Sequence, residues 1–199
     1  MVKFDGDGSC RTNFVQEKTN ILSCLLQKKK AMKKVLCFAM VGMVFFSCCS
    51  KLTVNNSVVK DFDVNRYLGD WYEIARLDHS FERGIEYAKA NYSIRDDGKI
   101  KVLNSGIKKG KESSAEGKAK FTDTPAHLRV SFFGPFYADY RILMIGPQYD
   151  YALVGSGSDN YLWILSRTPY LPDNIVREIL QNAKERGYNT DNLIWVKQK

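Results

Sequence analysis

Histidine and cysteine are the side chains that most often act as bases, nucleophiles or metal ligands, and this chain places them unevenly. All five cysteines fall within the first 49 residues, and the two histidines are His79 and His127. Spacing identifies no carboxylate partner for either histidine, and no Gly-x-Ser-x-Gly sequence marks a serine nucleophile. Beyond residue 49 these residue types are too few for thiolate catalysis or for a cysteine- or histidine-rich metal site. We therefore expect no enzyme, no bound metal and no cofactor.

A second kind of chemistry is indicated near the N-terminus, where a basic and then apolar segment ends before two cysteines. Lys33 and Lys34 precede an apolar run at residues 35–46, which has 12 residues. A bilayer span needs about 20 such residues, so the run is too short to cross a membrane. A basic start, a short apolar centre and a small residue, Ser47, are typical of a secretory signal peptide with Met32 as its initiator.

The cysteine after this segment is a candidate for covalent lipid attachment. The sequence around Cys48 resembles the lipobox of bacterial lipoproteins, in which the cysteine carries a thioether-linked diacylglycerol and an N-acyl chain. Phe45 and Phe46 stand where aliphatic or small residues are usual, so Cys49 is an alternative site, although the preceding serine favours Cys48. Several acyl chains hold a protein durably on a membrane. An ordinary secretory signal with two incidental cysteines is the other interpretation.

These features divide the chain into four segments. Residues 1–31 are interpreted as an upstream extension from a misplaced start codon, and residues 32–47 as the lipoprotein signal peptide. Residues 48–64 are expected to hold the lipidated cysteine and a polar tether, because they are short of large apolar side chains. Residues 65–199 are predicted to form one folded domain.

The net charge of +8 suggests nucleic-acid binding until it is divided along the chain. Residues 1–47 carry eight Lys or Arg against three Asp or Glu, which leaves 22 against 19 in the remaining 152 residues. A domain with a net charge of only +3 offers no strong electrostatic attraction to a phosphate backbone. We therefore expect no nucleic-acid partner.

The elements that must position any binding residues are short strands. Eight strand-like runs recur about every 8 to 12 positions, and Asp97-Gly98 is a typical hairpin turn between two of them. The runs lie at residues 71–76, 90–94, 100–104, 117–121, 128–132, 141–145, 151–155 and 161–166. Eight antiparallel strands can close into a barrel whose interior holds one small ligand.

One stretch near the C-terminus has helical periodicity. Asp173 can cap a helix whose apolar face includes Ile175 and Ile179, with Gly187 as a left-handed stop. A short late strand follows at residues 193–196. The predicted fold is all-β: an eight-stranded antiparallel up-and-down β-barrel with one C-terminal α-helix packed outside and a short late strand.

Three residues at the two ends of this pattern carry a family resemblance. Gly69 and Trp71 begin the first strand in a Gly-x-Trp sequence, and Arg167 follows the eighth strand directly before the helix. This combination resembles the lipocalin family. The stretches YLGDWYEIARLDHSFERG, ANYSIRDDGKIKVLN, VSFFGPFYADY and LWILSRTP are similar to bacterial outer-membrane lipocalins, which are apolipoprotein D-like. We expect Trp71 to plug the narrow end of the barrel and Arg167 to lie across its indole, a contact of about 0.5 to 2 kcal/mol.

The resemblance, combined with strand alternation, selects the side chains that face the barrel interior. We predict that nine of them bind ligand: Ala90, Tyr92, Val102, Asn104, Leu128, Val130, Phe132, Tyr161 and Trp163. The alternative is that these residues pack a solid core. Small alanines leave volume, and the polar atoms of Tyr and Asn would lack partners in a filled interior, so a cavity is favoured.

The remaining candidate residues lie low in the barrel and around its mouth. Glu73 shares the parity of Trp71, so burial should raise the pKa of its carboxyl, and a structural hydrogen bond to a tyrosine is expected rather than catalysis. The long connection after the first strand, which arches over the mouth in lipocalins, contains His79, Phe81 and Arg83. These residues either gate the mouth or are ordinary solvent-facing loop residues. The aromatic turn at residues 132–137 is mouth lining, a protein-contact patch or hairpin packing.

The resemblance implies a carrier or scavenger of fatty acids or lysophospholipids, tethered by a lipid anchor to the outer membrane, on its periplasmic face. Burying an acyl tail would contribute ~25 cal/mol per Å² of apolar area. The rival hypothesis is a structural or dimerising envelope lipoprotein with a filled barrel, and a homodimer is a possible partner state. In that case the aromatic turn would be the contact surface.

Overall fold

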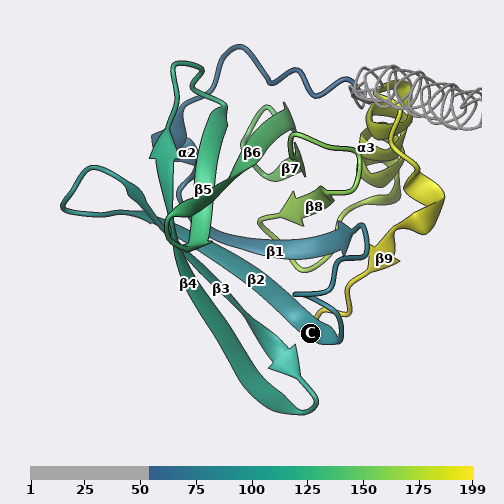
Figure 1. Ribbon diagram of the computed structural model, residues 1–199. Coiled ribbons are helices and arrows are strands. Elements are labelled where there is room, and N and C mark those ends of the chain that lie inside the picture. The colour runs from purple at the N-terminus through teal and green to yellow at the C-terminus, as the bar shows by residue number, and fades with distance from the viewer. Residues whose placement is uncertain (1–53) are drawn as a thin grey trace, which may run out of the picture. The chain divides into compact units, whose positions relative to one another are not determined.

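The computed structural model describes residues 54–199, which belong to one compact unit (Figure 1). Their strands form a single sheet in which β1 pairs with both β2 and β8, so eight antiparallel strands close on themselves, and β9 adds to β1. The predicted barrel is confirmed. The strands are β1 Gly69–Arg76, β2 Ile85–Ile94, β3 Ile100–Lys108, β4 Lys111–Phe121, β5 His127–Phe133, β6 Phe136–Ile145, β7 Tyr151–Gly155, β8 Leu162–Ser166 and β9 Ile194–Trp195.

The barrel has a closed end and an open end, here called the mouth. The short helix α2, Val64–Tyr67, lies at the closed end, where β1 begins. The hairpins β3–β4, β5–β6 and β7–β8 turn at the mouth, as does the β1–β2 connection at residues 77–84. The up-and-down order follows from the antiparallel pairing, because each strand returns beside the one before it.

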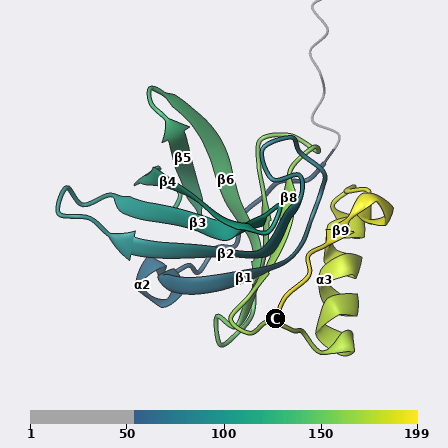
Figure 2. The same cartoon turned by 90° about the horizontal axis from the view of Figure 1, so that it is seen from below.

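The helix α3, Asp173–Glu185, packs on the outside of the barrel (Figure 2). Its Ile179 and Ala183 are fully buried against outward-facing residues of the sheet such as Leu153 and Ile164. Asp173 is the first helical residue instead of its cap, because Pro172 occupies the N-cap position. Gly187, with φ of 94°, supplies the left-handed residue expected after the helix.

Both ends of the described chain are fixed to the barrel. Residues 54–63, which the sequence assigned to the tether, pack against it: the Val59 amide donates to the Ile142 carbonyl at 3.0 Å, and the Asp63 amide donates to the Tyr149 hydroxyl at 2.8 Å. Arg186 holds the start of this arm by donating to the carbonyls of Asn55 and Ser57. The segment boundaries at residues 31, 47 and 64 stay predictions, and the first two lie outside the described residues.

The C-terminal tail completes the barrel wall near the mouth. β1 and β2 pair only from Gly69 to Tyr72, and the tail lies between the remaining halves of these strands. It forms four hydrogen bonds there: Val196 N to Ile74 O, Tyr87 N to Lys197 O, and Gln198 Nε2 to both Glu73 O and Ala88 O. Backbone groups that a regular β1–β2 ladder would pair are thereby satisfied.

Candidate ligand-binding site

Strand register shows which side chains face the lumen. Trp71 pairs with Ala90, Ala90 with Asn104, and Asn104 with Ala115, so these four side chains share one face. Trp71 lies in the buried cluster inside the barrel, which makes that face the inner one. By the same rule eight of the nine predicted residues face inward, and Tyr161 lies just before β8 at the mouth.

The closed end is plugged by Trp71. Its indole is fully buried and donates to the Tyr67 carbonyl at 2.8 Å. The guanidinium of Arg167 lies 3.8 Å from the ring centroid and donates to the carbonyls of Asp70 and Leu68, among others. Gly69 has φ of 93°, and a Cβ there would lie 3.5 Å from the Arg167 guanidinium. The stacking expected from the sequence is therefore present, with a structural role.

Above the plug, three tyrosine hydroxyls form a chain at the floor of the lumen. The Tyr140 hydroxyl lies 2.7 Å from that of Tyr67 and 2.8 Å from that of Tyr92. Burial raises the pKa of each phenol above its ordinary value, so all three remain protonated at neutral pH. Three hydroxyl protons serve the two hydrogen bonds between them, so one O–H is not used within the chain of three.

Tyr140 is a site residue that sequence reasoning missed. Parity in its strand could not be assigned from the sequence, but Tyr140 pairs with Leu128, which faces inward. A bulge between Ile142 and Met144 then reverses the alternation, so Met144 packs in the outer cluster and Ile145 faces inward. The bulge explains why a simple alternating pattern could not be read there.

The two halves of the lumen differ in how they are filled. Tyr92, Val102 and Leu128 are buried among the floor residues, so the solid-core alternative describes the closed half. In the upper half, inward-facing side chains remain accessible: Ala90, Asn104, Val130, Phe132 and Trp163 are half-buried, and Ala115 is exposed. The upper half of the lumen is therefore less completely filled than the floor, and its partly accessible inward-facing side chains are apolar and aromatic with one amide.

A buried charged cluster lies at the mouth. Arg76 donates to the Glu73 carboxylate at 2.5 Å, and its Nε lies 3.8 Å from Glu82. The indole of Trp163 donates to the same Glu82 carboxylate at 3.2 Å. Burial, and then the charge of Glu82, raise the pKa of Glu73 to about 8 despite Arg76, and burial raises the pKa of Glu82. The sequence anticipated the shift at Glu73 but not its partner, which is Arg76 and not a tyrosine.

The β1–β2 connection covers part of the mouth with aromatic rings. His79 is buried, stacks on Phe81 at a centroid distance of 4.2 Å, and lies 5.2 Å from the Trp163 ring. Burial and the Arg76 charge lower the pKa of His79 to about 4, so its imidazole is neutral at pH 7. Arg83, in contrast, forms an exposed ion pair with Asp78. His79 and Phe81 thus belong to the mouth, and Arg83 to the solvent side of the loop.

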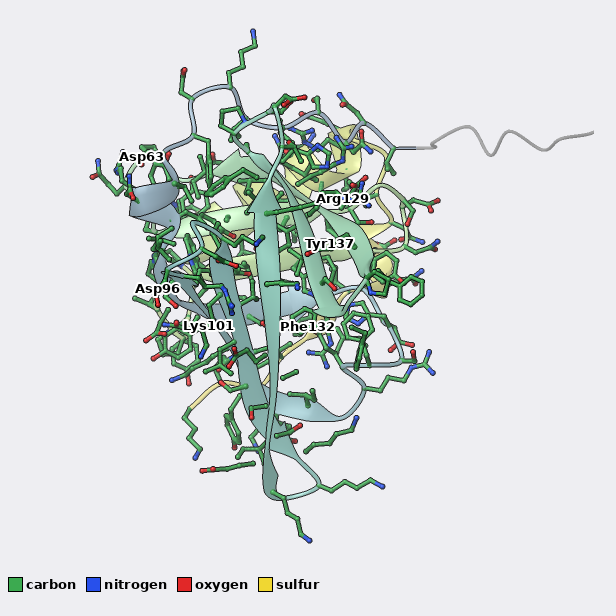
Figure 3. All side chains as sticks on the ribbon, turned by 60° about the vertical axis from the view of Figure 1, so that its left-hand side comes forward. Asp63, Asp96, Lys101, Arg129, Phe132 and Tyr137 are labelled. Carbon is green, nitrogen blue, oxygen red and sulfur yellow. The ribbon has the colours of Figure 1, made fainter. Side chains whose placement is uncertain are left out.

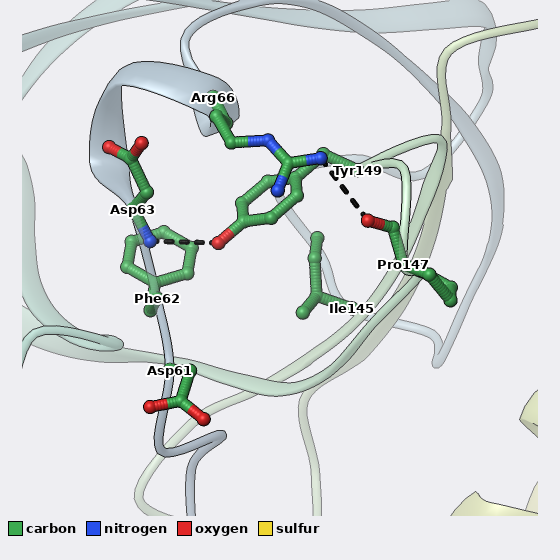
Figure 4. Close-up of a pocket in the computed structure, with 8 residues that line it drawn as sticks. Asp61, Phe62, Asp63, Arg66, Ile145, Pro147 and Tyr149 are labelled. Atoms are coloured by element: carbon green, nitrogen blue, oxygen red, sulfur yellow. Dashed lines mark hydrogen bonds between the residues drawn. The ribbon is translucent and has the colours of Figure 1, made fainter.

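Two pockets lie elsewhere on the domain, and none of the nine predicted residues lines them. One, of about 450 Å³, lies between α2 and the β6–β7 turn, where Arg66 packs over the Tyr149 ring and donates to the Pro147 carbonyl (Figure 4). The other, of about 670 Å³, lies beside the C-terminal tail. Among residues 54–199, no three His, Cys, Asp or Glu side chains gather as metal ligands, and no helix is long and apolar enough to cross a bilayer. Cys48 and Cys49 lie outside the described residues.

Comparison with known proteins identifies a family for this chain. A family model for a lipocalin-like domain matches residues 62–198. The chain is 50% identical over 146 residues to outer membrane lipoprotein Blc of Citrobacter freundii, covering 71% of this chain and 82% of the relative. It is 42% identical over 130 residues to apolipoprotein D of Rattus norvegicus, covering 61% and 68%. Insecticyanin from the tobacco hornworm Manduca sexta superposes with a TM-score of 0.62 at 22% identity, over 73% of this chain and 85% of that chain, a similarity of fold.

Proposed function

Because the chain belongs to the lipocalin family, we propose that it is a carrier that holds one fatty acid or lysophospholipid in the upper half of its barrel. The chain is a lipid-binding lipocalin by family and fold. The observation that supports this ligand class is the incomplete burial of inward-facing Val130, Phe132 and Trp163 above the tyrosine floor. Apolar walls of this kind favour an acyl tail, whose burial contributes about 25 cal/mol per Å².

The polar groups of the lumen are better suited to binding a lipid head group than to catalysing a reaction. Asn104 lies on the inner face between the floor and the mouth, so its amide can donate to and accept from a carboxyl or glycerol oxygen. The Glu73, Arg76 and Glu82 side chains are engaged with one another and with Trp163. His79 also has a carboxylate partner that its sequence spacing did not reveal, because its Nε2 lies 3.3 Å from Glu82, but this pair is buried within the same cluster. The family and fold are those of binding proteins, so non-covalent binding accounts for the site.

We place this protein in the outer membrane, because its relatives at about 50% identity are named outer membrane lipoproteins. We further propose that Cys48 carries the lipid anchor, with Cys49 as the alternative, and that the domain faces the periplasm. The signal-like segment that ends at Ser47 supports this assignment. The anchor would hold the barrel beside the lipids that it binds.

A structural or dimerising lipoprotein is the second candidate. The filled closed half and the exposed side chains of Phe133 and Phe136 favour it, because exposed aromatic residues often mark contacts between proteins. The incomplete burial of the inward-facing side chains in the upper half is the observation against it, since a purely structural barrel gains stability by packing them closely.

Native mass spectrometry of the full chain, purified from cells in mild detergent, tests the two candidates. The carrier hypothesis predicts a monomer with one fatty acid or lysophospholipid, which delipidation removes and which either lipid restores at one equivalent. A chain that arrives empty, takes up neither lipid after delipidation and runs as a tight dimer would exclude the carrier hypothesis.

A further inference from the structure

The larger of the two pockets lies on the outside of the barrel wall, beside the C-terminal tail. Tyr72 pairs with Lys89, and Lys89 pairs with Ser105. Ser105 pairs in turn with Ser114, so the four side chains form a row across β1, β2, β3 and β4. The row faces outward, because the adjacent Trp71 faces the lumen. We call the pocket between this row and the tail the outer groove. Its volume of about 670 Å³ is within the range of pockets that hold small molecules.

The C-terminal tail is a fixed wall of the outer groove. Gln198 lines the groove, and its side-chain amide donates to two main-chain carbonyls, one on β1 at 2.7 Å and one on β2 at 3.0 Å. Tyr87 also lines the groove, and its amide donates to the Lys197 carbonyl at 2.8 Å. The φ of Tyr87 is 53°, a conformation that is rare for an aromatic residue and that gathers at ligand sites. The walls are therefore positioned by hydrogen bonds within the chain, without a ligand.

The positive charge of the domain is concentrated around the outer groove. Residues 86–89, 107–112 and 196–199 together carry six lysines against two glutamates. Residues 107–112 form the end of the β3–β4 hairpin, which extends past the other strands (Figure 3). The surplus of four positive charges exceeds the net charge of +3 over residues 48–199. Within the described chain none of these six lysines forms an ion pair, whereas Lys99 and Lys101 do. The surface around the groove therefore attracts anions.

Two of the lysines that line the groove are held over tyrosine rings instead of beside carboxylates. The Lys89 ammonium lies 4.4 Å from the centroid of the Tyr72 ring, and the Lys199 ammonium lies 4.9 Å from that of Tyr87. An aromatic ring attracts an ammonium group but does not neutralise its charge. Both cations are therefore positioned at the groove and keep their charge for an anionic ligand.

Hydroxyl and carboxylate groups lie beside these cations. Ser105 and Ser114 follow Lys89 in the row, and neither hydroxyl has a hydrogen-bond partner among residues 54–199. Glu112 lines the groove two positions before Ser114 on β4, so it shares the outer face. The groove thus presents donors and acceptors for uncharged hydroxyl groups next to its two cations.

A sugar phosphate matches this combination of groups. Lysine ammonium groups form charge-assisted hydrogen bonds with phosphate oxygens, whereas serine hydroxyls and a carboxylate bind the hydroxyls of a sugar. We propose that the outer groove binds a phosphorylated sugar, with its phosphate at Lys89 and Lys199 and its sugar hydroxyls at Ser105, Ser114 and Glu112. The site is separate from the lumen and goes beyond the proposed function, on which it does not rest.

Titration calorimetry of the full chain in mild detergent tests this site with three probes: N-acetylglucosamine 1-phosphate, N-acetylglucosamine and inorganic phosphate. We expect the sugar phosphate to bind at one equivalent and at least tenfold more tightly than either of the other two. No binding of the sugar phosphate would overturn the proposal. So would an affinity equal to that for inorganic phosphate, because the sugar would then contribute nothing.

Matched variants locate the ligand. Lys89→Gln should weaken binding of the sugar phosphate about tenfold, which corresponds to about 1.4 kcal/mol. The control is Lys120→Gln, because Lys120 also lies on the outer face with its ammonium 4.6 Å from a tyrosine ring, that of Tyr137, but outside the groove. The control should bind as the parent chain does. Equal losses in the two variants would overturn the proposal, since general attraction to a positive surface would then explain the binding.

A double variant tests the sugar part of the site. Ser105→Ala with Ser114→Ala should weaken the sugar phosphate several-fold and leave the affinity for inorganic phosphate unchanged. An unchanged affinity for the sugar phosphate would contradict the assignment of these hydroxyls. Both side chains are exposed, so the fold should persist, and the midpoint of urea unfolding checks this.

A phosphorylated sugar can be a free solute or the head of a glycolipid, and a fourth probe separates these sources. The probe is a bisphosphorylated N-acetylglucosamine disaccharide, which carries no acyl chains and so has no tail for the lumen. Binding at least tenfold tighter than that of the monosaccharide identifies a glycolipid head as the ligand. Equal or weaker binding identifies the free sugar phosphate. Fatty-acid uptake should be the same in Lys89→Gln as in the parent, which keeps this site distinct from the lumen.

Discussion

Arg76 donates to Glu73 across 2.5 Å inside the barrel, although the two side chains are three positions apart on one strand and should face opposite sides. The explanation is a bulge. The β1–β8 register shifts between Glu73 and Ala75, and the extra residue turns both Glu73 and Arg76 toward the lumen. A single inserted residue thus creates the buried ion pair of the mouth.

Replacing Arg76 should be costly because it would leave the buried carboxyl groups of Glu73 and Glu82 without their cationic partner. For Arg76→Met we expect a loss of about 3 to 5 kcal/mol in the free energy of unfolding, measured by urea titration at pH 8. The matched control is Arg83→Met, which removes an exposed ion pair with Asp78 and should cost no more than about 1 kcal/mol. If the two substitutions lowered the free energy of unfolding equally, the buried ion pair would contribute no more to stability than the exposed one.

The stability of the domain should depend on the titration of Glu73 near neutral pH. The pKa of this carboxyl is about 8 in the folded chain, above its ordinary value of 4.5. The folded state therefore holds a proton that the unfolded state has released, and stability falls as pH rises from about 5 through 8. The fall from one such group is at most about 1.4 kcal/mol per pH unit.

Glu73→Gln isolates this contribution. The variant should lose the downward slope between pH 6 and 8 in urea titrations, while His79, whose pKa is about 4, changes stability only at lower pH. Because its pKa lies below the ordinary 6.5, His79 stabilises the fold above pH 6.5 and loses that effect as pH falls toward 4. Parallel pH profiles of the variant and the parent from 6 to 8 would contradict the assignment to Glu73.

The C-terminal tail should stabilise the mouth more than its exposed position suggests. Removing residues 196–199 deletes four hydrogen bonds to β1 and β2, so we expect a loss of about 2 to 4 kcal/mol in the free energy of unfolding. Hydrogen exchange of the Tyr87 backbone amide, which donates to the Lys197 carbonyl, should become faster in the truncated chain. Removing Lys199 alone is the control. It should change neither the free energy of unfolding nor the exchange rate of Tyr87, because it removes only a weak contact with the Tyr87 ring.

The lipid anchor is tested by Cys48→Ala in cells. The variant should leave the membrane fraction and lose labelling by radioactive palmitate, because the acyl chains would have no site of attachment. Labelling that persists in Cys48→Ala and disappears in Cys49→Ala would move the anchor to Cys49. Persistence in both variants would remove the lipobox interpretation.

The sequence predicted those parts of the fold in which alternation is uninterrupted. Gly69, Trp71 and Arg167 fix the closed end, and regular β2–β3–β4–β5 ladders place Asn104 and Val130 on the inner face. Where a bulge breaks the alternation, the sequence could not predict the outcome: Arg76 turns inward after one bulge, and Tyr140 precedes another. A bulge depends on pairing between distant strands, so its position is not visible in either strand alone.

Long-range contacts also explain the arm and the tail. Residues 54–63 are polar enough to resemble a tether, yet the arm is held by a backbone hydrogen bond from Val59 to Ile142 of β6 and by Arg186, far along the chain. The tail at 197–199, beyond the predicted late strand, carries no strand signal and pairs because β1 and β2 separate beside it. The acceptors of these hydrogen bonds are main-chain carbonyls, which every sequence has, so composition does not reveal them.

Ligand binding in the upper lumen predicts that Trp163 contributes apolar contact and not only a hydrogen bond. Trp163→Ala should weaken binding of a fluorescent fatty acid about 10- to 100-fold, since roughly 100 Å² of apolar wall would be lost at ~25 cal/mol per Å². The fold should persist because Trp163 is only half-buried. Trp163→Phe removes the donor to Glu82 but keeps an aromatic wall, so its affinity should stay close to that of the parent. Trp195→Ala changes a 52% exposed tryptophan outside the barrel and should have no effect on affinity. If Trp163→Phe weakened binding as much as Trp163→Ala, the indole hydrogen bond at the mouth would be the determinant, and an unchanged affinity in all three variants would place the ligand outside this lumen.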